Sequence, residues 1–276
     1  MHVESVSFRD TPCIRIANEG ASALVALHGG HVLSWVAADG RERLFLGARS
    51  RFDGASAIRG GIPVIFPQFS GRGRLGRHGF ARTAPWAFAG VEADAAVFEL
   101  ADDGTRFHGW GHPCMLRLRV TLGAMALQVA LEVDNSGHQP LAFTAALHTY
   151  LRVDDIAHVA IEGLQGCDFE DSAAGGTLHR QHDHEVTFDN ETDRIYADVV
   201  TPLTLIDGAR RLAIEQQGFA DVVAWNPGAA LASTIADLAA GEYRQFACVE
   251  AAQVLQPAWL APGQRWQGWQ RLQAQP

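Results

Sequence analysis

Residues 116–137 read LRLRVTLGAMALQVALEVDNSG, and this stretch decides the fold class because apolar side chains recur at every second position. The alternation runs from Leu116 to Leu122 and returns, after a short break, from Leu127 to Val133. A period of two is typical of a β-strand with one buried face, since successive side chains point to opposite faces. The turn-forming residues DNSG end the stretch, so it predicts an antiparallel hairpin.

Similar short segments recur along the chain, and most are bounded by Gly, Asp, Asn or Pro. They are CIRIANEG (13–20), ALVALHGGHVLSWVAADG (23–40), AVFELADDG (96–104), HVAIEGLQG (158–166), LTLIDGARRLAIEQQG (203–218), DVVAWNPG (221–228), QFACVEAAQV (245–254) and RWQGWQRLQ (265–273). Strands at fairly regular intervals indicate a β-sandwich or barrel. No linker divides the chain, so we expect one all-β domain over residues 1–276. The best helical candidate is residues 232–243, where Ser233 or Thr234 could act as N-cap.

The composition fits a compact protein of the cytoplasm. The chain has 276 residues, of which 47% are hydrophobic and 19% are charged, so it can bury a sizeable core. Its formal net charge of -9 argues against a general role on nucleic acid or on a membrane surface. We find no signal peptide and no apolar run of membrane-spanning length. Four widely spaced cysteines without a CxxC pair predict reduced thiols: Cys13, Cys114, Cys167 and Cys248.

The stretch from Arg59 to Arg82, RGGIPVIFPQFSGRGRLGRHGFAR, gathers positive charge in an acidic chain. It holds five arginines and one histidine among six glycines. The glycines permit a left-handed backbone and a close approach to a ligand, and guanidinium groups suit phosphate or carboxylate. Charge alone leaves two interpretations open, a solvated surface loop and a site for an anion.

Two titratable residues lie within apolar, strand-like segments. His148 lies in ALHTYLRVDDI, and Glu250 lies in QFACVEAAQV. A buried carboxylate costs free energy unless it is paired, and desolvation raises its pKa toward the range useful to a general base. The alternatives are a core histidine whose hydrogen bonds are satisfied and a strand-end carboxylate that faces water.

A histidine-rich segment, HRQHDHE, contains His179, His182 and His184. Histidines bind zinc, but this segment lacks a sharp ligand spacing and follows DSAAGGT, so we interpret it as a solvated loop. The chain also has no P-loop, no GxGxxG turn and no GxSxG elbow, which disfavours nucleotide chemistry and serine hydrolysis. A histidine and a glutamate on distant strands, without a cofactor motif, suit simple proton transfer.

Six motifs occur in an order and spacing that resemble a known family. They are AIRGGIPVIFPQF (57–69), RHGFARTAPW (77–86), ALHTYLRVDDI (146–156), ETDRIYADV (191–199), VVAWNPG (222–228) and FACVEAAQV (246–254). Together they resemble the hexose-6-phosphate mutarotases, the glucose-6-phosphate 1-epimerase branch of the aldose 1-epimerase superfamily. The resemblance covers most of the chain, and it implies a large antiparallel β-sandwich of the galactose mutarotase type with very little helix.

The resemblance also implies roles for seven residues. His148 matches the catalytic histidine of the LHTY motif, and Glu250 matches the catalytic glutamate of the CVE motif. The residues implied to bind the substrate are Arg59, Arg77, His78, Arg82 and Asp193. Position 77 departs from the family pattern, in which Gln or another residue precedes HG. Which of Arg72, Arg74 and Arg77 contacts a phosphate therefore stays open.

By this resemblance the protein interconverts the α and β anomers of a hexose 6-phosphate, expected to be glucose 6-phosphate, by acid/base ring opening and reclosure. No metal or organic cofactor is implied, and we expect a monomer whose partner is the phosphosugar, with no nucleic acid and no membrane. Three alternatives remain. They are the same chemistry on unphosphorylated aldoses, a non-catalytic sugar-binding β-sandwich with walls such as Trp225, and a metal-dependent β-barrel enzyme that uses the segment 179–184.

Overall fold

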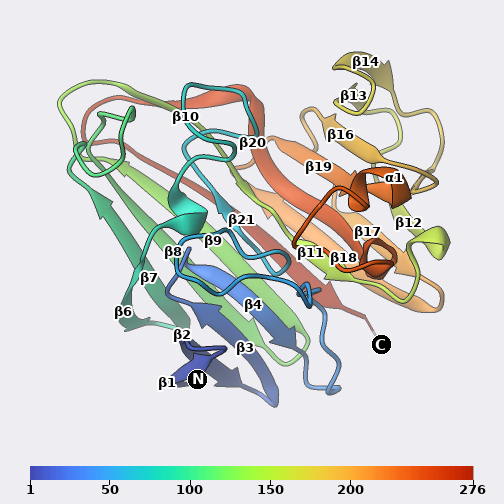
Figure 1. Cartoon of the computed structure of the whole chain (residues 1–276), viewed down its shortest axis with the longest axis horizontal. Helices are drawn as coiled ribbons and strands as arrows, with labels where there is room; N and C mark the ends of the chain where they lie inside the picture. Colours follow the sequence, from blue (N-terminus) through green and yellow to red (C-terminus); the bar gives the residue numbers. More distant parts are fainter. Residues whose placement is uncertain (276) are drawn as a thin grey trace.

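The computed structural model describes residues 1–275, whose strands form three sheets. The N-terminal sheet has the order β1-β2-β3-β4, with strands β1 (His2–Phe8), β2 (Thr11–Asn18), β3 (Ala21–Ala26) and β4 (His31–Val36). This sheet, blue in Figure 1, packs through β2 and β3 against β8 (Cys114–Gly123) of a larger sheet. Within the described residues all the paired strands run antiparallel.

The larger sheet has nine strands in the order β15-β12-β17-β18-β21-β9-β8-β7-β6. Besides β8 it contains β6 (Ala87–Glu92), β7 (Ala95–Asp102), β9 (Ala126–Asn135), β12 (Val159–Glu162), β15 (Glu185–Thr187), β17 (Leu203–Asp207), β18 (Arg210–Gln217) and β21 (Arg265–Ala274). The hairpin predicted from residues 116–137 is confirmed as β8 and β9, in a register that places Leu118 opposite Leu131.

The third sheet has eight strands, and it carries the site described below. Its order is β14-β13-β16-β19-β20-β10-β5, and β11 also pairs with β20. The strands are β5 (Val64–Ile65), β10 (Leu141–Leu147), β11 (Tyr150–Arg152), β13 (Asp168–Asp171), β14 (Thr177–Arg180), β16 (Thr192–Tyr196), β19 (Asp221–Asn226) and β20 (Phe246–Leu260). The predicted antiparallel β-sandwich is therefore confirmed.

Strand β20 shows how the core positions a polar residue. Seven consecutive residues, Phe246–Ala252, are buried, in contrast to the half-buried alternation of β8. Ala247 and Val249 belong to the main core, whereas Phe246 and Cys248 pack into a second apolar cluster on the opposite face. A central strand covered on both faces keeps water away from each of its side chains. Glu250 shares the face of Phe246 and Cys248, so its carboxyl lies where solvent is scarce.

Helix is scarce, as predicted, but the expected helix over residues 232–243 is wrong. The α-helix α1 spans Gly228–Ala232 and ends where the prediction begins. The Ser233 and Thr234 hydroxyls donate to the carbonyls of Ala230 and Leu231, so these side chains satisfy the end of a helix and do not cap the start of one. Residues 1–275 also form three 3-10 helices, η1 (Ala81–Thr83), η2 (Ile156–His158) and η3 (Glu242–Gln245).

The cysteines are free, as the spacing predicted, and three of the four are buried: Cys13, Cys114 and Cys248. Across residues 1–275 we find no helix with the length and apolar character needed to cross a membrane.

Candidate active site

The register of the eight-stranded sheet brings His148 and Glu250 together. β10 ends with Leu147 opposite Ala251, and β11 starts with Tyr150 opposite Cys248. Residues 148–149, which connect β10 to β11, therefore lie opposite residues 249–250 of β20. This register places His148 opposite Glu250. Their side chains meet, with 3.2 Å between His148 Nδ1 and Glu250 Oε1. Sequence separation alone could not predict this contact, because it depends on which strands pair.

The same face of the sheet also carries Asp193. In β16 and β19, Asp193 lies opposite Trp225, which in turn lies opposite Cys248 of β20. Since alternate residues of a strand share a face, Asp193, Trp225 and Glu250 point to one side of the sheet. The predicted sugar-binding aspartate and the predicted catalytic pair thus open onto one region.

Burial sets the electrostatics of the pair. Glu250 is 1% exposed, and its burial together with the nearby charge of Asp193 raises its pKa well above the usual range. Burial also lowers the pKa of His148, and the positive charges of Arg82 and Arg59 lower it further. Without a ligand both groups therefore favour their neutral forms. The 3.2 Å approach of His148 Nδ1 to Glu250 Oε1 lacks the geometry of a hydrogen bond, so within residues 1–275 His148 Nδ1 and Glu250 Oε2 have no hydrogen-bond partner. Such unmet capacity is typical of a ligand site.

Arg59 reaches the site because of the two glycines that follow it. Gly60 and Gly61 have left-handed φ values of +106° and +62°. A Cβ at either position would lie 2.3 Å from Phe45 O or 2.2 Å from Val32 O, so other residues do not fit. The Arg59 guanidinium is held by Asp237, at 3.1 Å from Nη2 to Oδ1, and by Tyr150, at 3.0 Å from Nη1 to Oη. The arginine is therefore fixed before a ligand arrives.

Arg77, His78 and Arg82 come from the arginine-rich loop. His78 is buried, its Nδ1 accepts a hydrogen bond from the Ser70 backbone N–H, and burial lowers its pKa to about 2, helped by the charges of the neighbouring arginines. Arg82 donates to the Arg77 carbonyl. Burial lowers the pKa of Arg82 to about 10. Among residues 1–275 neither Arg77 nor Arg82 has an ion-pair partner, so this end of the cavity offers uncompensated positive charge.

The rest of the loop faces elsewhere. Arg72 forms an ion pair with Glu170 of β13, and Arg74 is exposed and lines a different cavity with Trp110. Of the three arginines between which the sequence could not choose, Arg77 is the one that borders the cavity of His148 and Glu250.

All seven residues singled out from the sequence border one cavity of about 180 Å³. Its remaining walls are mostly apolar: Phe69, Ser70, Val223, Trp225, Leu231 and Ile235. The volume lies below the 300–1,000 Å³ typical of drug-sized ligands and suits a small polar one. Sequence reasoning missed Asp237 and the role of Tyr150. Tyr150 is part of the quoted LHTY motif, but no sequence signal marks Asp237, which lies in a turn segment mistaken for a helix.

Tyr150 also orders the histidine. Its ring stacks on that of His148 at 4.8 Å between centroids and 7° between planes, while Trp225 meets His148 edge-on at 5.7 Å. Because its hydroxyl accepts from Arg59, Tyr150 links the cationic part of the cavity to the predicted acid.

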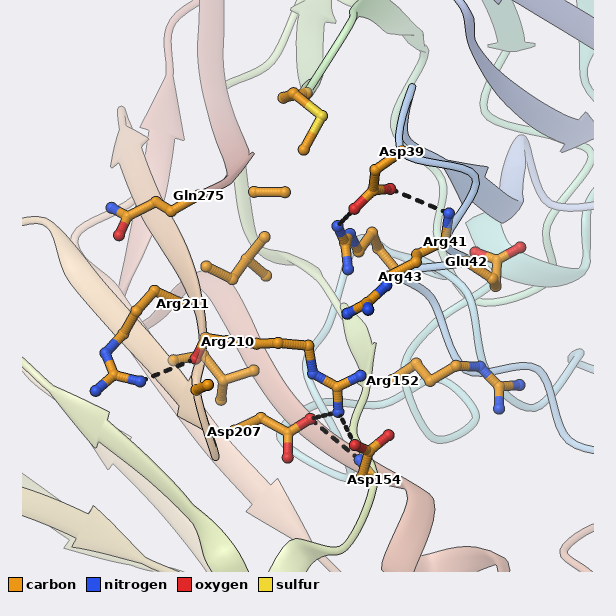
Figure 2. A pocket seen from close by; sticks show the side chains of 15 residues that line it. Asp39, Arg41, Glu42, Arg43, Arg152, Asp154, Asp207, Arg210, Arg211 and Gln275 are labelled. Atoms are coloured by element: carbon orange, nitrogen blue, oxygen red, sulfur yellow. Dashed lines mark hydrogen bonds and ion pairs between the residues drawn. The ribbon is translucent and has the colours of Figure 1, made fainter.

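A larger cavity of about 1110 Å³, shown in Figure 2, contains none of the seven residues. Its charges largely compensate one another, since Arg43 pairs with Asp39, and Arg210 pairs with both Asp154 and Asp207. It offers no buried histidine or glutamate pair, so it is not the centre of the predicted proton transfer.

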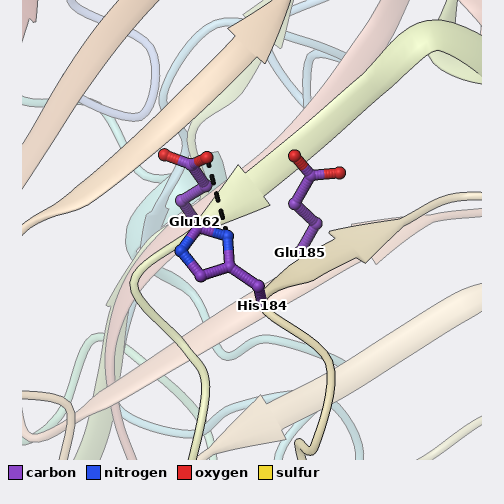
Figure 3. Close-up of side chains that lie close together, drawn as sticks. All are labelled: Glu162, His184 and Glu185. Atoms are coloured by element: carbon purple, nitrogen blue, oxygen red, sulfur yellow. Dashed lines mark ion pairs between the residues drawn. The ribbon is translucent and has the colours of Figure 1, made fainter.

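The histidine-rich segment does not assemble a three-histidine metal site. His179 lies on the exposed strand β14, which corrects the expected loop at that point, and it contacts Thr177. Figure 3 shows that His184 instead lies near Glu162 and Glu185. His184 Nδ1 is 3.7 Å from Glu162 Oε1. Pairing of β15 with β12 causes this approach. An exposed group of this kind is common without a metal.

Comparison with known proteins decides the family. Residues 12–273 match the family model described as aldose 1-epimerase. The chain belongs to the aldose 1-epimerase family. This assignment confirms the resemblance drawn from the six motifs, and with it the enzyme class, an isomerase.

Two relatives are similar to this chain over most of their length. A protein of Cenchrus ciliaris is 33% identical over 268 residues, covering 92% of this chain and 82% of its own. A protein of Escherichia coli K12 is 36% identical over 238 residues, covering 83% of this chain and 79% of its own. Both are provisionally named glucose-6-phosphate 1-epimerase. The crystal structure of YeaD from Salmonella typhimurium, provisionally described as a mutarotase, superposes with a TM-score of 0.89 at 31% identity, covering 99% of this chain and 93% of its own.

Proposed function

We propose that this protein interconverts the α and β anomers of a hexose 6-phosphate, glucose 6-phosphate being the expected substrate, without a cofactor. One observation carries the proposal: a single small cavity holds the buried His148–Glu250 pair beside Arg77 and Arg82, which lack carboxylate partners. The pair suits proton transfer, and the arginines suit a phosphate dianion. The provisional names of the relatives support the same substrate class.

The ring-opening step needs one base and one acid. Glu250, as carboxylate, takes the proton of the C1 hydroxyl while protonated His148 gives its proton to the ring oxygen as the C1–O5 bond breaks. The open aldehyde turns about C1–C2 and recloses with the two roles reversed, so no net proton is gained or lost. After ring opening both side chains are neutral, which is the state that their burial favours. Each such group contributes typically 10²- to 10⁴-fold in rate.

The phosphate would also prepare the acid. The positive charges of Arg82 and Arg59 lower the pKa of His148. A bound phosphate dianion offsets these charges and therefore raises the pKa of His148 toward the protonated form that ring opening requires. It also offsets the effect of Arg82 on Glu250, whose pKa rises too, but two of these arginines act on His148 and only one on Glu250, so the gain at His148 is the larger. On this account the phosphate is both an anchor and an electrostatic activator. A neutral sugar supplies neither effect, which disfavours unphosphorylated aldoses as the main substrates.

The free cysteines, Cys167 among them partly exposed, support the expected reducing compartment, the cytoplasm. The proposed acid, base and arginines lie together in one chain, so catalysis requires no residue of a second copy, and we expect the protein to act as a monomer.

Removal of either member of the pair tests the catalytic assignment. We expect Glu250→Gln and His148→Asn each to lower kcat by at least about 100-fold, since each loses one proton-transfer group. Binding of the phosphosugar, measured by calorimetry, should stay within a few-fold of wild type because the arginines remain. Wild-type turnover in either variant would contradict the assignment. Binding by the wild type without any anomer exchange would instead favour a non-catalytic sugar-binding module.

A further inference from the structure

A glutamine occupies a core position between the two large sheets. Along β21 the inward-facing residues are Gly268, Gln270, Leu272 and Ala274, and Gln270 is 2% exposed. An apolar side chain is expected there, because an amide buried without hydrogen bonds costs free energy. Gln270 does make such bonds, but with the opposite sheet. Its Nε2 donates to Val249 O at 2.9 Å, and its Oε1 accepts from Thr149 Oγ1 at 2.5 Å.

The bond from Gln270 to Val249 replaces a backbone hydrogen bond that is missing between β20 and the segment that joins β10 to β11. Thr149 and Val249 lie opposite each other, and the Val249 N–H donates to Thr149 O at 3.2 Å. In a regular antiparallel pair the Thr149 N–H would return the bond to Val249 O. Here it turns back to Leu147 O at 2.9 Å, which leaves Val249 O without its ladder donor. The amide of Gln270 takes the place of that donor.

The missing backbone bond lies between the two proposed catalytic residues. The turn from Leu147 to Thr149 contains His148, and Val249 directly precedes Glu250. Gln270 bonds to the neighbour of each and borders no part of the cavity. We propose that Gln270 is a positioning residue that holds the turn carrying His148 against the strand carrying Glu250, and so sets the separation of the acid and the base. This inference rests on the proposed function.

The expected effect of losing this connection is on the chemical step. Reacting groups displaced by about 1 Å can cost about 10²-fold in rate. Because Gln270 does not face the ligand, KM should change little. We therefore expect Gln270→Met, which keeps the side-chain length and removes the amide, to lower kcat about 10- to 100-fold with KM within about threefold.

The variant is compared with a matched control on the same strand. Leu272→Ala disturbs the same core by leaving a cavity, and Leu272 makes no hydrogen bond to either proposed catalytic segment. With glucose 6-phosphate as probe, below the melting temperature of each variant, Leu272→Ala should keep a kcat near wild type. An equal loss of kcat in both variants would show a general structural effect and overturn the inference. So would a wild-type kcat in Gln270→Met.

Thr149 offers an independent test if Gln270→Met does not fold. Thr149→Ser keeps the hydroxyl that donates to Gln270 and should retain kcat, whereas Thr149→Val should lose it. Equal kcat values for the two would overturn the inference. Should the wild type itself not accelerate anomer exchange, the proposed function fails separately. Crystal structures would then decide this inference, which requires the His148–Glu250 contact of 3.2 Å to lengthen in Thr149→Val and not in Thr149→Ser.

Discussion

At the scale of single residues, the cavity gathers groups that the fold would be more stable without. Glu250, His148 and Asp193 are ionisable and are covered by the walls of one cavity. Burial penalises the charge of each of them, a cost that natural proteins accept mainly at functional sites. A mutation that removes one of these charges should therefore raise the stability of the folded protein and lower its activity.

Asp193 gives the clearest case, because burial raises its pKa from 3.8 to about 6. The folded state thus holds its proton more tightly than the unfolded state, and the associated stability is present below pH 4 and is lost as the pH rises through 6. Asp193→Asn removes this cost. We expect the free energy of unfolding at pH 7 to rise by up to about 3 kcal/mol, with no gain at pH 4, in urea titrations at both pH values.

The same variant should lose activity, since a contact from a charged group is worth about 1.5–3 kcal/mol, or about 10- to 100-fold in kcat/KM. Asp193→Asn with the stability of wild type at pH 7 would contradict the electrostatic account. Unchanged kcat/KM would remove Asp193 from the substrate site.

At the scale of elements, the arginine-rich loop divides into a ligand-facing part and a fastened part. The buried amide of Gln68 donates to the carbonyls of Ser70, Leu75 and Gly76, and Arg72 fastens the loop to β13 through Glu170. The loop is therefore held at its base and at its side, and Arg77 is the arginine between residues 70 and 77 that borders the cavity.

Arg77 and Arg74 form a matched pair for testing this division. Both are exposed arginines of one loop, but only Arg77 borders the cavity. We expect Arg77→Ala to lower kcat/KM for glucose 6-phosphate about 10- to 100-fold and Arg74→Ala to leave it unchanged. Steady-state kinetics of the two variants settle the point. Equal losses of kcat/KM would indicate that the loop acts through its overall positive charge and not through a specific contact of Arg77 with the substrate.

At this scale the sequence predicts features that depend on neighbouring residues, and it does not predict contacts between segments that lie far apart in the chain. The alternation in 116–137 is a local signal, so the hairpin of β8 and β9 was predictable residue by residue. The helix expected over residues 232–243 is wrong, because Ser233 and Thr234 bond backward to helix carbonyls, which propensity cannot distinguish from N-capping. The motifs named the seven cavity residues, but the ion pair of Arg59 with Asp237 joins segments far apart in sequence and left no local signal.

At the scale of the whole molecule, the chain combines a net charge of -9 with a local excess of arginine at one cavity. The overall charge repels extended polyanions, whereas the cavity accepts a small dianion close to the proton-transfer pair. The fold supplies this arrangement through long-range pairing, since β20 joins β10, β11 and β19. The alternation of apolar residues predicted the class of fold, but only this pairing brings His148, Glu250 and Asp193 to one face.

The central claim is that the 6-phosphate both binds to the arginines and prepares His148, and one measurement tests it most directly. Exchange NMR gives the rate at which the wild-type protein interconverts the anomers of glucose 6-phosphate and, in parallel, of glucose. Because glucose has no phosphate for the arginines to bind, we predict that kcat/KM for glucose 6-phosphate is at least about 100-fold higher. Equal values for the two sugars, or no acceleration of either, would contradict the account.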